Sequence, residues 1–142
     1  MSVLFSRPCE YALQAVLYIA LKPQGEMTSI KELTSKFNIP YHFLSKILQR
    51  LANKGILSSM TGPGGGFALA VSPTNISLYH IVEAVDGDAF VTKCVMGFAE
   101  CNEKSPCAVH SKWENLRYGI QMMLMEKNIL EMAKDMNKQE YR

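Results

Sequence analysis

The chain has 142 residues, enough for one compact domain with an extension but too few for two full domains. Apolar residues make up 48% and charged residues 20%, which excludes a disordered or fibrous chain, and no apolar run reaches the ~18 residues of a membrane span. Residues 1–75 contain seven basic and three acidic side chains, whereas the rest of the chain contains eight basic and ten acidic ones. The net charge of +2 therefore conceals a basic N-terminal half, which suits nucleic acid.

The first residues lack the long apolar stretch and the cleavage site of a secretory signal. We therefore expect a cytoplasmic protein with no membrane partner. In that reducing compartment, clustered cysteines bind metal or react more often than they form structural disulfides. The four cysteines of the chain thus indicate a metal or redox site, not a disulfide framework.

Three helices are predicted in the N-terminal part of the chain. The first covers about 8–21, where apolar residues recur at helical spacing, and a loop with proline and glycine ends it. The second covers about 29–37 and begins with Ser29 and Glu32, which have the spacing of a capping box. The third covers about 40–54 and has one apolar and one polar face.

Two helices separated by a short turn, the second with a polar face, are typical of a helix-turn-helix. The polar face of the third helix is therefore the candidate recognition surface for bases and nearby phosphates in double-stranded DNA. Its residues are Tyr41, His42, Ser45, Lys46, Gln49 and Arg50.

Two strand-like runs, 56–60 and 67–71, flank a glycine-rich turn and predict a β-hairpin. A hairpin directly after a helix-turn-helix is a wing, and glycines in it leave backbone N–H groups free to approach a phosphate. The wing adds four candidate DNA contacts: Thr61, Gly62, Gly64 and Gly65. A nucleotide-binding phosphate loop is disfavoured, since the glycines precede neither Gly-Lys-Ser/Thr nor a helix.

A short fourth helix is predicted over 78–85, followed by a polar loop over 88–106 and one long helix from 109 or 110 to about 137. Such a helix would extend ~40 Å, longer than the core of a small domain can cover, so its apolar stripe is expected to pack partly on a second subunit. The predicted class is mainly α with a small β-hairpin wing. Its parts are a winged helix-turn-helix (1–75), a linking helix with a cysteine-containing loop (76–108) and a long dimerisation helix with a tail (109–142).

The strongest chemical feature is a run of three cysteines and a histidine. Its members are Cys94, Cys101, Cys107 and His110, with six, five and two residues between successive members. Thiolates suit iron-sulfur clusters, zinc or copper(I). Structural zinc sites usually contain a pair of ligands with roughly two to four residues between them, so the wider cysteine gaps favour an iron-sulfur cluster over zinc.

Three cysteines leave one coordination position open. His110 is the nearest candidate in sequence, and Glu10 and Cys9 in the first helix are the others, supplied by a second subunit. In the plainer interpretation, His110 caps or orients the long helix and Cys9 is a small packing residue. A thiol switch without metal is a further alternative, as are three unrelated thiols.

An enzyme is not predicted. A nucleophilic pair drawn from Cys107 and His110 would lack an evident orienting partner and oxyanion pocket. A second competing function is a protein-interaction module, in which the winged helix binds a protein and not DNA.

Over nearly its whole length the chain resembles the Rrf-two (Rrf2) family of bacterial winged-helix regulators, which includes the iron-sulfur cluster regulator, the nitric-oxide-sensitive repressor and the cysteine-metabolism repressor. The matching segments are Glu10-Tyr11-Ala12-Leu13, Ile39-Pro40-Tyr41-His42-Phe43-Leu44, Gly62-Pro63-Gly64-Gly65-Gly66-Phe67, Ile81-Val82-Glu83-Ala84-Val85-Asp86-Gly87 and the cysteine run. The wing and cysteine motifs together are quite specific.

The resemblance implies a homodimer with a long crossing helix on a palindromic operator. It also implies a [2Fe-2S] or [4Fe-4S] cluster on Cys94, Cys101 and Cys107, with His110 or Glu10 of the other subunit as fourth ligand. We favour [2Fe-2S], and we expect aerobically prepared protein to lack the cluster because exposed clusters oxidise. DNA affinity would then respond to redox, nitric oxide or iron-sulfur status.

Three positions depart from the family pattern. Cys101 is seven positions after Cys94, whereas in some family members successive cysteines are always six positions apart. Thr61 stands where a wing arginine often occurs, and Ser45 stands where the iron-sulfur cluster regulator has an acidic residue. The last two departures leave the operator sequence open.

Overall fold

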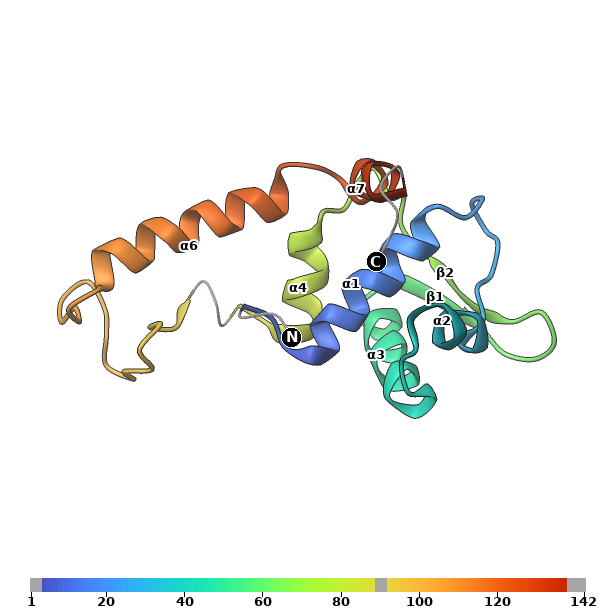
Figure 1. The fold of residues 1–142 in the computed structure, drawn as a ribbon, viewed down its shortest axis with the longest axis horizontal. Coiled ribbons are helices and arrows are strands. Elements are labelled where there is room, and N and C mark those ends of the chain that lie inside the picture. The colour runs from blue at the N-terminus through green and yellow to red at the C-terminus, as the bar shows by residue number, and fades with distance from the viewer. Residues whose placement is uncertain (1–3, 89–91, 138–142) are drawn as a thin grey trace.

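The computed structural model describes residues 4–88 and 92–137. It confirms a mainly helical protein with one two-stranded antiparallel hairpin (Figure 1). The elements in chain order are α1 (Arg7–Ala20), α2 (Ile30–Phe37), α3 (Tyr41–Asn53), β1 (Leu57–Met60), β2 (Gly66–Leu69), α4 (Leu78–Asp86), α6 (His110–Met125) and α7 (Ile129–Asn137). In the described part of the chain, no helix is long and apolar enough to cross a membrane.

The first two helices begin at side-chain caps. The Ser6 hydroxyl accepts the backbone N–H of Cys9 at the start of α1, and the Ser29 hydroxyl accepts that of Glu32 (3.1 Å) at the start of α2. Of the predicted capping box at α2, the hydrogen bond to the Ser29 hydroxyl is thus confirmed. The Glu32 carboxylate instead accepts hydrogen bonds from Tyr18 and from Lys22, at 2.7 Å from the latter, and so connects α2 to the end of α1.

α3 turns its apolar side inward and its polar side outward. Leu44, Leu48 and Leu51 are fully buried against α1, which contributes small side chains such as Ala12 and Ala15 to the same core. Small residues on one helix allow the larger leucines of its neighbour to approach closely. The polar face of α3 remains on the surface.

The hairpin is anchored to the packed helices α1 to α4, which we call the body, by a third segment that the sequence does not predict. β1 and β2 pair in register from Leu57↔Leu69 to Met60↔Gly66. Phe67 also exchanges two backbone hydrogen bonds of 2.8 Å with Thr28, in the loop before α2. β2 is therefore held between β1 and this loop.

The predicted single C-terminal helix is in fact two helices. α6 ends at Met125, and Asn128 begins α7, since its side-chain oxygen accepts the Glu131 N–H (2.8 Å) and its amide donates to the Glu131 carboxylate (2.7 Å). Ile129, buried completely, also donates its N–H to the carbonyl of Ile76 (2.8 Å). Because Ile129 packs on the body at this point, the chain forms two helices although its apolar residues continue at helical spacing.

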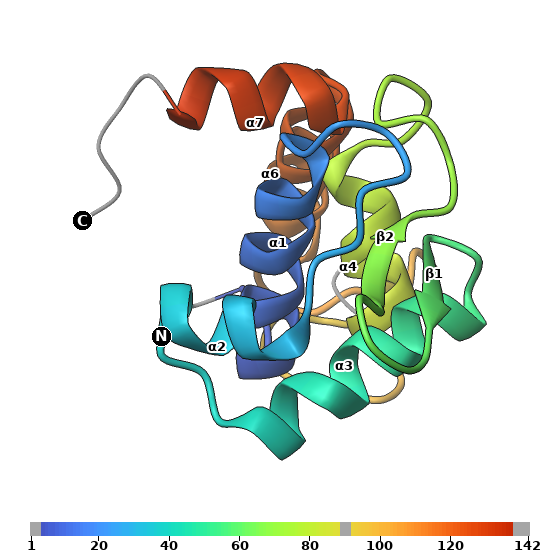
Figure 2. The ribbon, with the colours of Figure 1, turned by 90° about the vertical axis from the view of Figure 1, so that its right-hand side faces the viewer.

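The two C-terminal helices therefore have different surroundings. α7 packs on α1, across the end of the body (Figure 2). α6 approaches the body only at its C-terminal end, where Leu124 is buried, and projects away from it as an arm (Figure 1). Sixteen residues extend roughly 24 Å at 1.5 Å each, so the start of α6 lies well outside the winged-helix core.

Candidate metal centre and nucleic-acid interface

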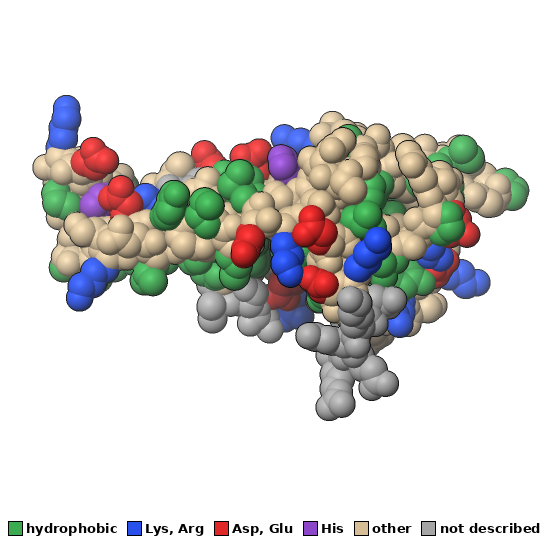
Figure 3. Space-filling view, turned by 90° about the horizontal axis from the view of Figure 1, so that it is seen from above, with side chains coloured by type: hydrophobic (Ala, Val, Ile, Leu, Met, Phe, Trp, Pro, Cys, Tyr) green, Lys and Arg blue, Asp and Glu red, His purple; other side chains and the backbone are tan. Residues whose placement is uncertain are grey.

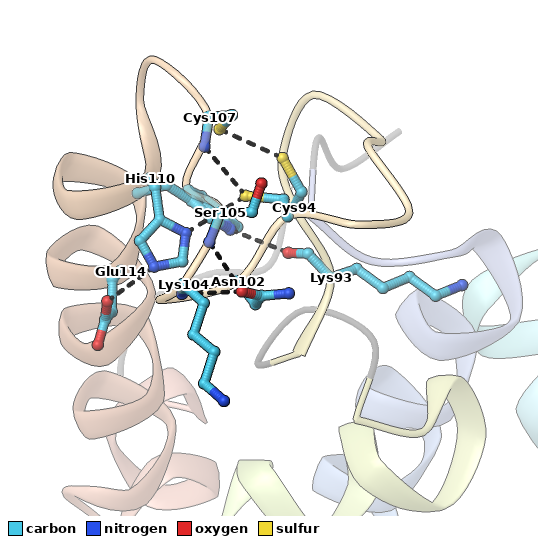
Figure 4. A network of polar contacts seen from close by, with 10 residues as sticks. Lys93, Cys94, Asn102, Lys104, Ser105, Cys107, His110 and Glu114 are labelled. Atoms are coloured by element: carbon cyan, nitrogen blue, oxygen red, sulfur yellow. Dashed lines mark hydrogen bonds and ion pairs between the residues drawn. The ribbon is translucent and has the colours of Figure 1, made fainter.

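Three cysteine sulfurs meet at the far end of the α6 arm. The Sγ atoms of Cys94, Cys101 and Cys107 all lie within 4.8 Å of one another, and all three residues are half-buried. The Sγ atoms of Cys94 and Cys107 are 3.6 Å apart (Figure 4). The structure thus brings together the whole cysteine trio that the sequence predicts.

Hydrogen bonds around the trio hold its loop in shape. The indole N–H of Trp113 on α6 donates to the carbonyl of Lys93 (3.1 Å), directly before Cys94. The side-chain oxygen of Asn102 accepts the backbone N–H groups of Lys104 (2.8 Å) and Ser105 (2.9 Å), which forms a tight turn between the second and third cysteines. The first contact ties the start of the loop to α6, and the others fix the shape of its middle (Figure 4).

Of the two predicted fourth ligands, His110 lies beside the sulfurs. Its Nδ1 is 3.3 Å from the Cys101 Sγ, and its Nε2 is 3.3 Å from the Glu114 carboxylate (Figure 4). Glu10 of the same chain lies on α1 in the body, 3.8 Å from the Arg7 guanidinium, and is outside the sulfur group. Cys9, the third candidate, is completely buried in the core.

The three sulfurs do not share one chemical environment. Burial alone would raise the pKa of Cys94, but hydrogen bonds from the backbone N–H groups of Phe98 and Met96 and from Cys107 lower it to about 7. The backbone N–H of Cys107, 3.4 Å from the Cys101 sulfur, lowers the pKa of Cys101. Burial and the neighbouring thiols outweigh this contact, so the Cys101 pKa is raised overall.

These pKa shifts predict an order of thiol reactivity. Because the thiolate is the nucleophile, alkylation of Cys94 by iodoacetamide in reduced, metal-free protein should rise with pH around a midpoint of about 7. Cys101 should require a higher pH. Burial, followed by the charge of Asp86, raises the pKa of Cys9 to about 12, so Cys9 should remain unmodified until the protein unfolds. Peptide mass spectrometry measures each rate, and native labelling of Cys9 as fast as Cys94 would contradict the order.

The trio fits a thiolate-bound metal. Three soft donors converge, and backbone N–H groups point at two of the sulfurs, which is the type of contact that tunes iron-sulfur centres. A tetrahedral zinc ion, with Zn–S bonds of about 2.3 Å, would separate its sulfur ligands by about 3.8 Å, which is close to the 3.6 Å between the Cys94 and Cys107 sulfurs. In a multi-iron cluster, thiolates on different irons lie farther apart, so the partly exposed loop would have to open to hold one.

The predicted DNA-contacting residues lie largely on the surface. On α3, Ser45 is half-buried and the others are exposed: Tyr41, His42, Lys46, Gln49 and Arg50. On the wing, Gly65 is half-buried, while Thr61, Gly62 and Gly64 are exposed. α3 leads directly into β1, so the two candidate contact regions belong to one continuous stretch of chain.

Arg50 has a contact that the sequence does not predict. Its Nη1 donates to the carbonyl of Val85 (3.1 Å), in the last turn of α4. The next residue, Asp86, accepts hydrogen bonds from the backbone N–H (2.9 Å) and the hydroxyl of Ser6, the cap of α1. The C-terminal turn of α4 is therefore bonded both to α3 and to the start of α1, and it leads into the segment that carries the cysteines.

Glu114 is the functional candidate that sequence reasoning missed. It stands four residues after His110, a spacing that places both side chains on one face of α6. The i, i+4 spacing was available from the sequence, but such pairs are common on exposed helices. The position of His110 against the sulfurs makes this pair distinctive.

The comparisons with known proteins agree with the winged helix and the helical arm. A model of the Rrf2 family, described as an iron-dependent transcriptional regulator, matches residues 5–135. A candidate HTH-type transcriptional regulator of Aquifex aeolicus is 37% identical over 122 residues, which cover 84% of this chain and 83% of that protein. The HTH-type transcriptional regulator IscR of Photobacterium profundum is 31% identical over 130 residues, covering 92% of this chain and 75% of its own.

Solved structures show the same fold. CymR of B. subtilis, the global cysteine regulator, superposes with a TM-score of 0.76 at 24% identity, covering 94% of this chain and 98% of its own. IscR of T. potens superposes with a TM-score of 0.76 at 21% identity, covering 100% and 93%. The family match spans nearly the whole chain, and the relatives are transcription regulators and not enzymes. The chain therefore belongs to the Rrf2 family of transcription regulators.

Proposed function

We propose that this regulator is a homodimer that binds a palindromic operator with an affinity set by an iron-sulfur cluster on Cys94, Cys101 and Cys107. The observation that carries the proposal is the convergence of the three sulfurs within 4.8 Å of one another, with the His110 Nδ1 3.3 Å from one of them. We propose His110 as fourth ligand, with Glu10 of a second subunit as the alternative. When bound, the cluster would supply iron–thiolate bonds that respond to oxidation or loss of iron.

The proposed DNA-binding surface is α3 with the wing. The α3 face is polar and exposed, and it carries Lys46 and Gln49 one helical turn apart. Gln49 has the donor and acceptor pair that reads adenine in the major groove, whereas Lys46 supplies a positive charge for guanine or phosphate. The exposed wing glycines leave backbone N–H groups that suit a phosphate contact.

Dimerisation through α6 is supported by its uncovered apolar side chains. Leu116 is 63% exposed and Tyr118 64%, and Met122, Met123 and Met125 are about half exposed. Figure 3 shows apolar side chains along the arm. A symmetric pairing of two arms would cover these side chains and place two α3 helices for two half-sites.

The proposed link between cluster and operator runs through the end of α4. Six positions separate Asp88 from Cys94, and the preceding turn is bonded to α3 through Arg50 and to α1 through Asp86. A change in the shape of the cysteine loop would be passed along the chain to the element that supports α3. In a dimer, the same change at the far end of each arm would alter the spacing of the two recognition helices.

The test is operator affinity with and without the cluster. A duplex is selected from a randomised library with anaerobically purified protein, and its affinity is measured by fluorescence anisotropy for cluster-loaded and chelator-treated protein. We expect at least a fivefold difference, the lower end of typical coupling between two sites. Iron, sulfide and zinc analysis identifies what the trio holds.

Lys46→Ala is the matched control. If Lys46 contacts phosphate, the variant should weaken both forms equally and flatten the salt dependence, while the ratio between loaded and cluster-free protein persists. Equal affinity of the loaded and cluster-free forms would contradict the sensing step. Zinc without sulfide would replace the cluster with a zinc-stabilised site, and failure to select any duplex would favour the protein-interaction module.

A further inference from the structure

The two nitrogens of the His110 ring face different groups. Nδ1 points to the Cys101 sulfur at 3.3 Å, and Nε2 points to the Glu114 carboxylate at 3.3 Å (Figure 4). Nε2 is shielded from solvent, and its alignment with the carboxylate falls short of a hydrogen bond, so within the described residues it has no fully formed partner. A buried ring nitrogen that has a carboxylate nearby but no hydrogen bond is uncommon in native proteins.

A histidine can bind a metal through Nδ1 only when that atom has no proton. Neutral imidazole carries one proton, and the group that accepts a hydrogen bond from one nitrogen keeps the proton there and frees the other. A carboxylate beside Nε2 selects the tautomer with Nε2–H and leaves the Nδ1 lone pair facing the sulfurs. Carboxylate–histidine–metal chains of this type orient the ring and raise its basicity as a ligand.

We infer that Glu114 is a positioning residue, which holds His110 in the tautomer and orientation that present Nδ1 to the metal centre. This inference rests on the proposed function, because it requires a metal at the cysteine trio. Closure of the Nε2–H···Glu114 contact into a full hydrogen bond would accompany metal binding, as polar contacts around a site tighten when it is filled.

The pair differs from an ordinary ion pair on a helix surface in two ways. In a surface pair both groups are in water, whereas the His110 Nε2 is shielded and only the Glu114 end of the contact is half exposed. Glu114 and His110 also line a hollow of about 210 Å³ whose wall includes Cys94, Cys101 and Arg117. The carboxylate therefore belongs to the immediate surroundings of the sulfurs.

The experiment compares Glu114→Ala with Glu114→Gln in full-length, anaerobically reconstituted protein. Loss of the cluster to a chelator is followed by absorbance, and the ¹⁴N hyperfine coupling of the reduced protein is measured by pulsed EPR. Glu114→Ala should lose the cluster 10- to 100-fold faster, the usual effect of removing the partner of a metal-bound histidine, and should show a weakened or lost ¹⁴N coupling. Glu114→Gln should stay close to wild type, because its amide oxygen accepts the same hydrogen bond.

Two controls separate the inference from simpler explanations. Lys112→Ala removes an exposed side chain from the same turn of α6 and should change neither readout. His110→Ala should abolish the ¹⁴N coupling. If Glu114→Ala loses the cluster at the wild-type rate and keeps the wild-type ¹⁴N coupling, the role of Glu114 is overturned. If the coupling is unchanged in His110→Ala, His110 is not a ligand, and the role of Glu114 is overturned with it. Failure of the wild-type protein to bind iron and sulfide would instead overturn the proposed function itself.

Discussion

Replacing Cys101 with alanine is expected to abolish the visible absorbance of anaerobically purified protein completely. Cys101 faces the His110 Nδ1 and accepts the Cys107 N–H, so its sulfur connects the other members of the site. Its removal leaves two thiolates, too few for the cluster that the trio is proposed to hold. Absorbance together with iron and sulfide content measures the effect.

Cys9→Ala is the matched control for the loss of one cysteine. Cys9 lies in the α1 core, is completely buried and is absent from the sulfur group. This variant should keep the full iron content, with a loss in stability of about 1 kcal/mol, typical of a small change in a packed core. Undiminished absorbance in Cys101→Ala would show that Cys101 is not a ligand.

The winged helix could be predicted from the sequence because its signals are local. Serine caps, proline turns and the alternation of apolar and polar faces place α1, α2 and α3 within one or two residues of their observed ends. The glycine-rich turn likewise places the hairpin. The Thr28–Phe67 bridge was invisible, because a single paired residue leaves no alternating pattern in the sequence.

The break between α6 and α7 illustrates a different limit. The apolar stripe continues through the break, and Lys127 is its one visible interruption in the sequence. The break arises because Asn128 caps a new helix and Ile129 docks on Ile76, a contact between residues more than fifty positions apart. The spacing of apolar residues along one helix does not show which distant segment of the chain that helix contacts.

The candidate metal site was likewise predictable only in part. The cysteine spacing was sufficient to predict the trio, and the proximity of His110 to Cys101 singles out one of the two fourth-ligand candidates for testing. The roles of Glu114 beside His110 and of Arg50 against Val85 depend on side-chain directions, which the sequence does not contain. Arg50, which the sequence predicts as a DNA contact, forms a hydrogen bond that connects α3 to α4.

The wing glycines have two distinct physical roles. Gly62 and Gly64 have positive φ angles of 89° and 75°, and a Cβ atom on either would meet open space. Gly66 has φ 145°, and a Cβ there would lie 2.3 Å from the Thr28 carbonyl oxygen and 2.6 Å from its carbon. The sequence suggests backbone access to phosphate for this stretch, but at Gly66 the structure requires glycine because two backbones cross closely.

Gly66→Ala is therefore expected to destabilise the protein by about 3 kcal/mol. The new methyl group requires both a strained backbone angle and displacement of Thr28, whose two 2.8 Å hydrogen bonds with Phe67 anchor the wing. Gly64→Ala, in the same turn, has only the strained angle and should lose about 1 kcal/mol. Urea unfolding followed by far-UV circular dichroism measures both, and equal losses would show that the crossing at Thr28 does not control the stability of the wing.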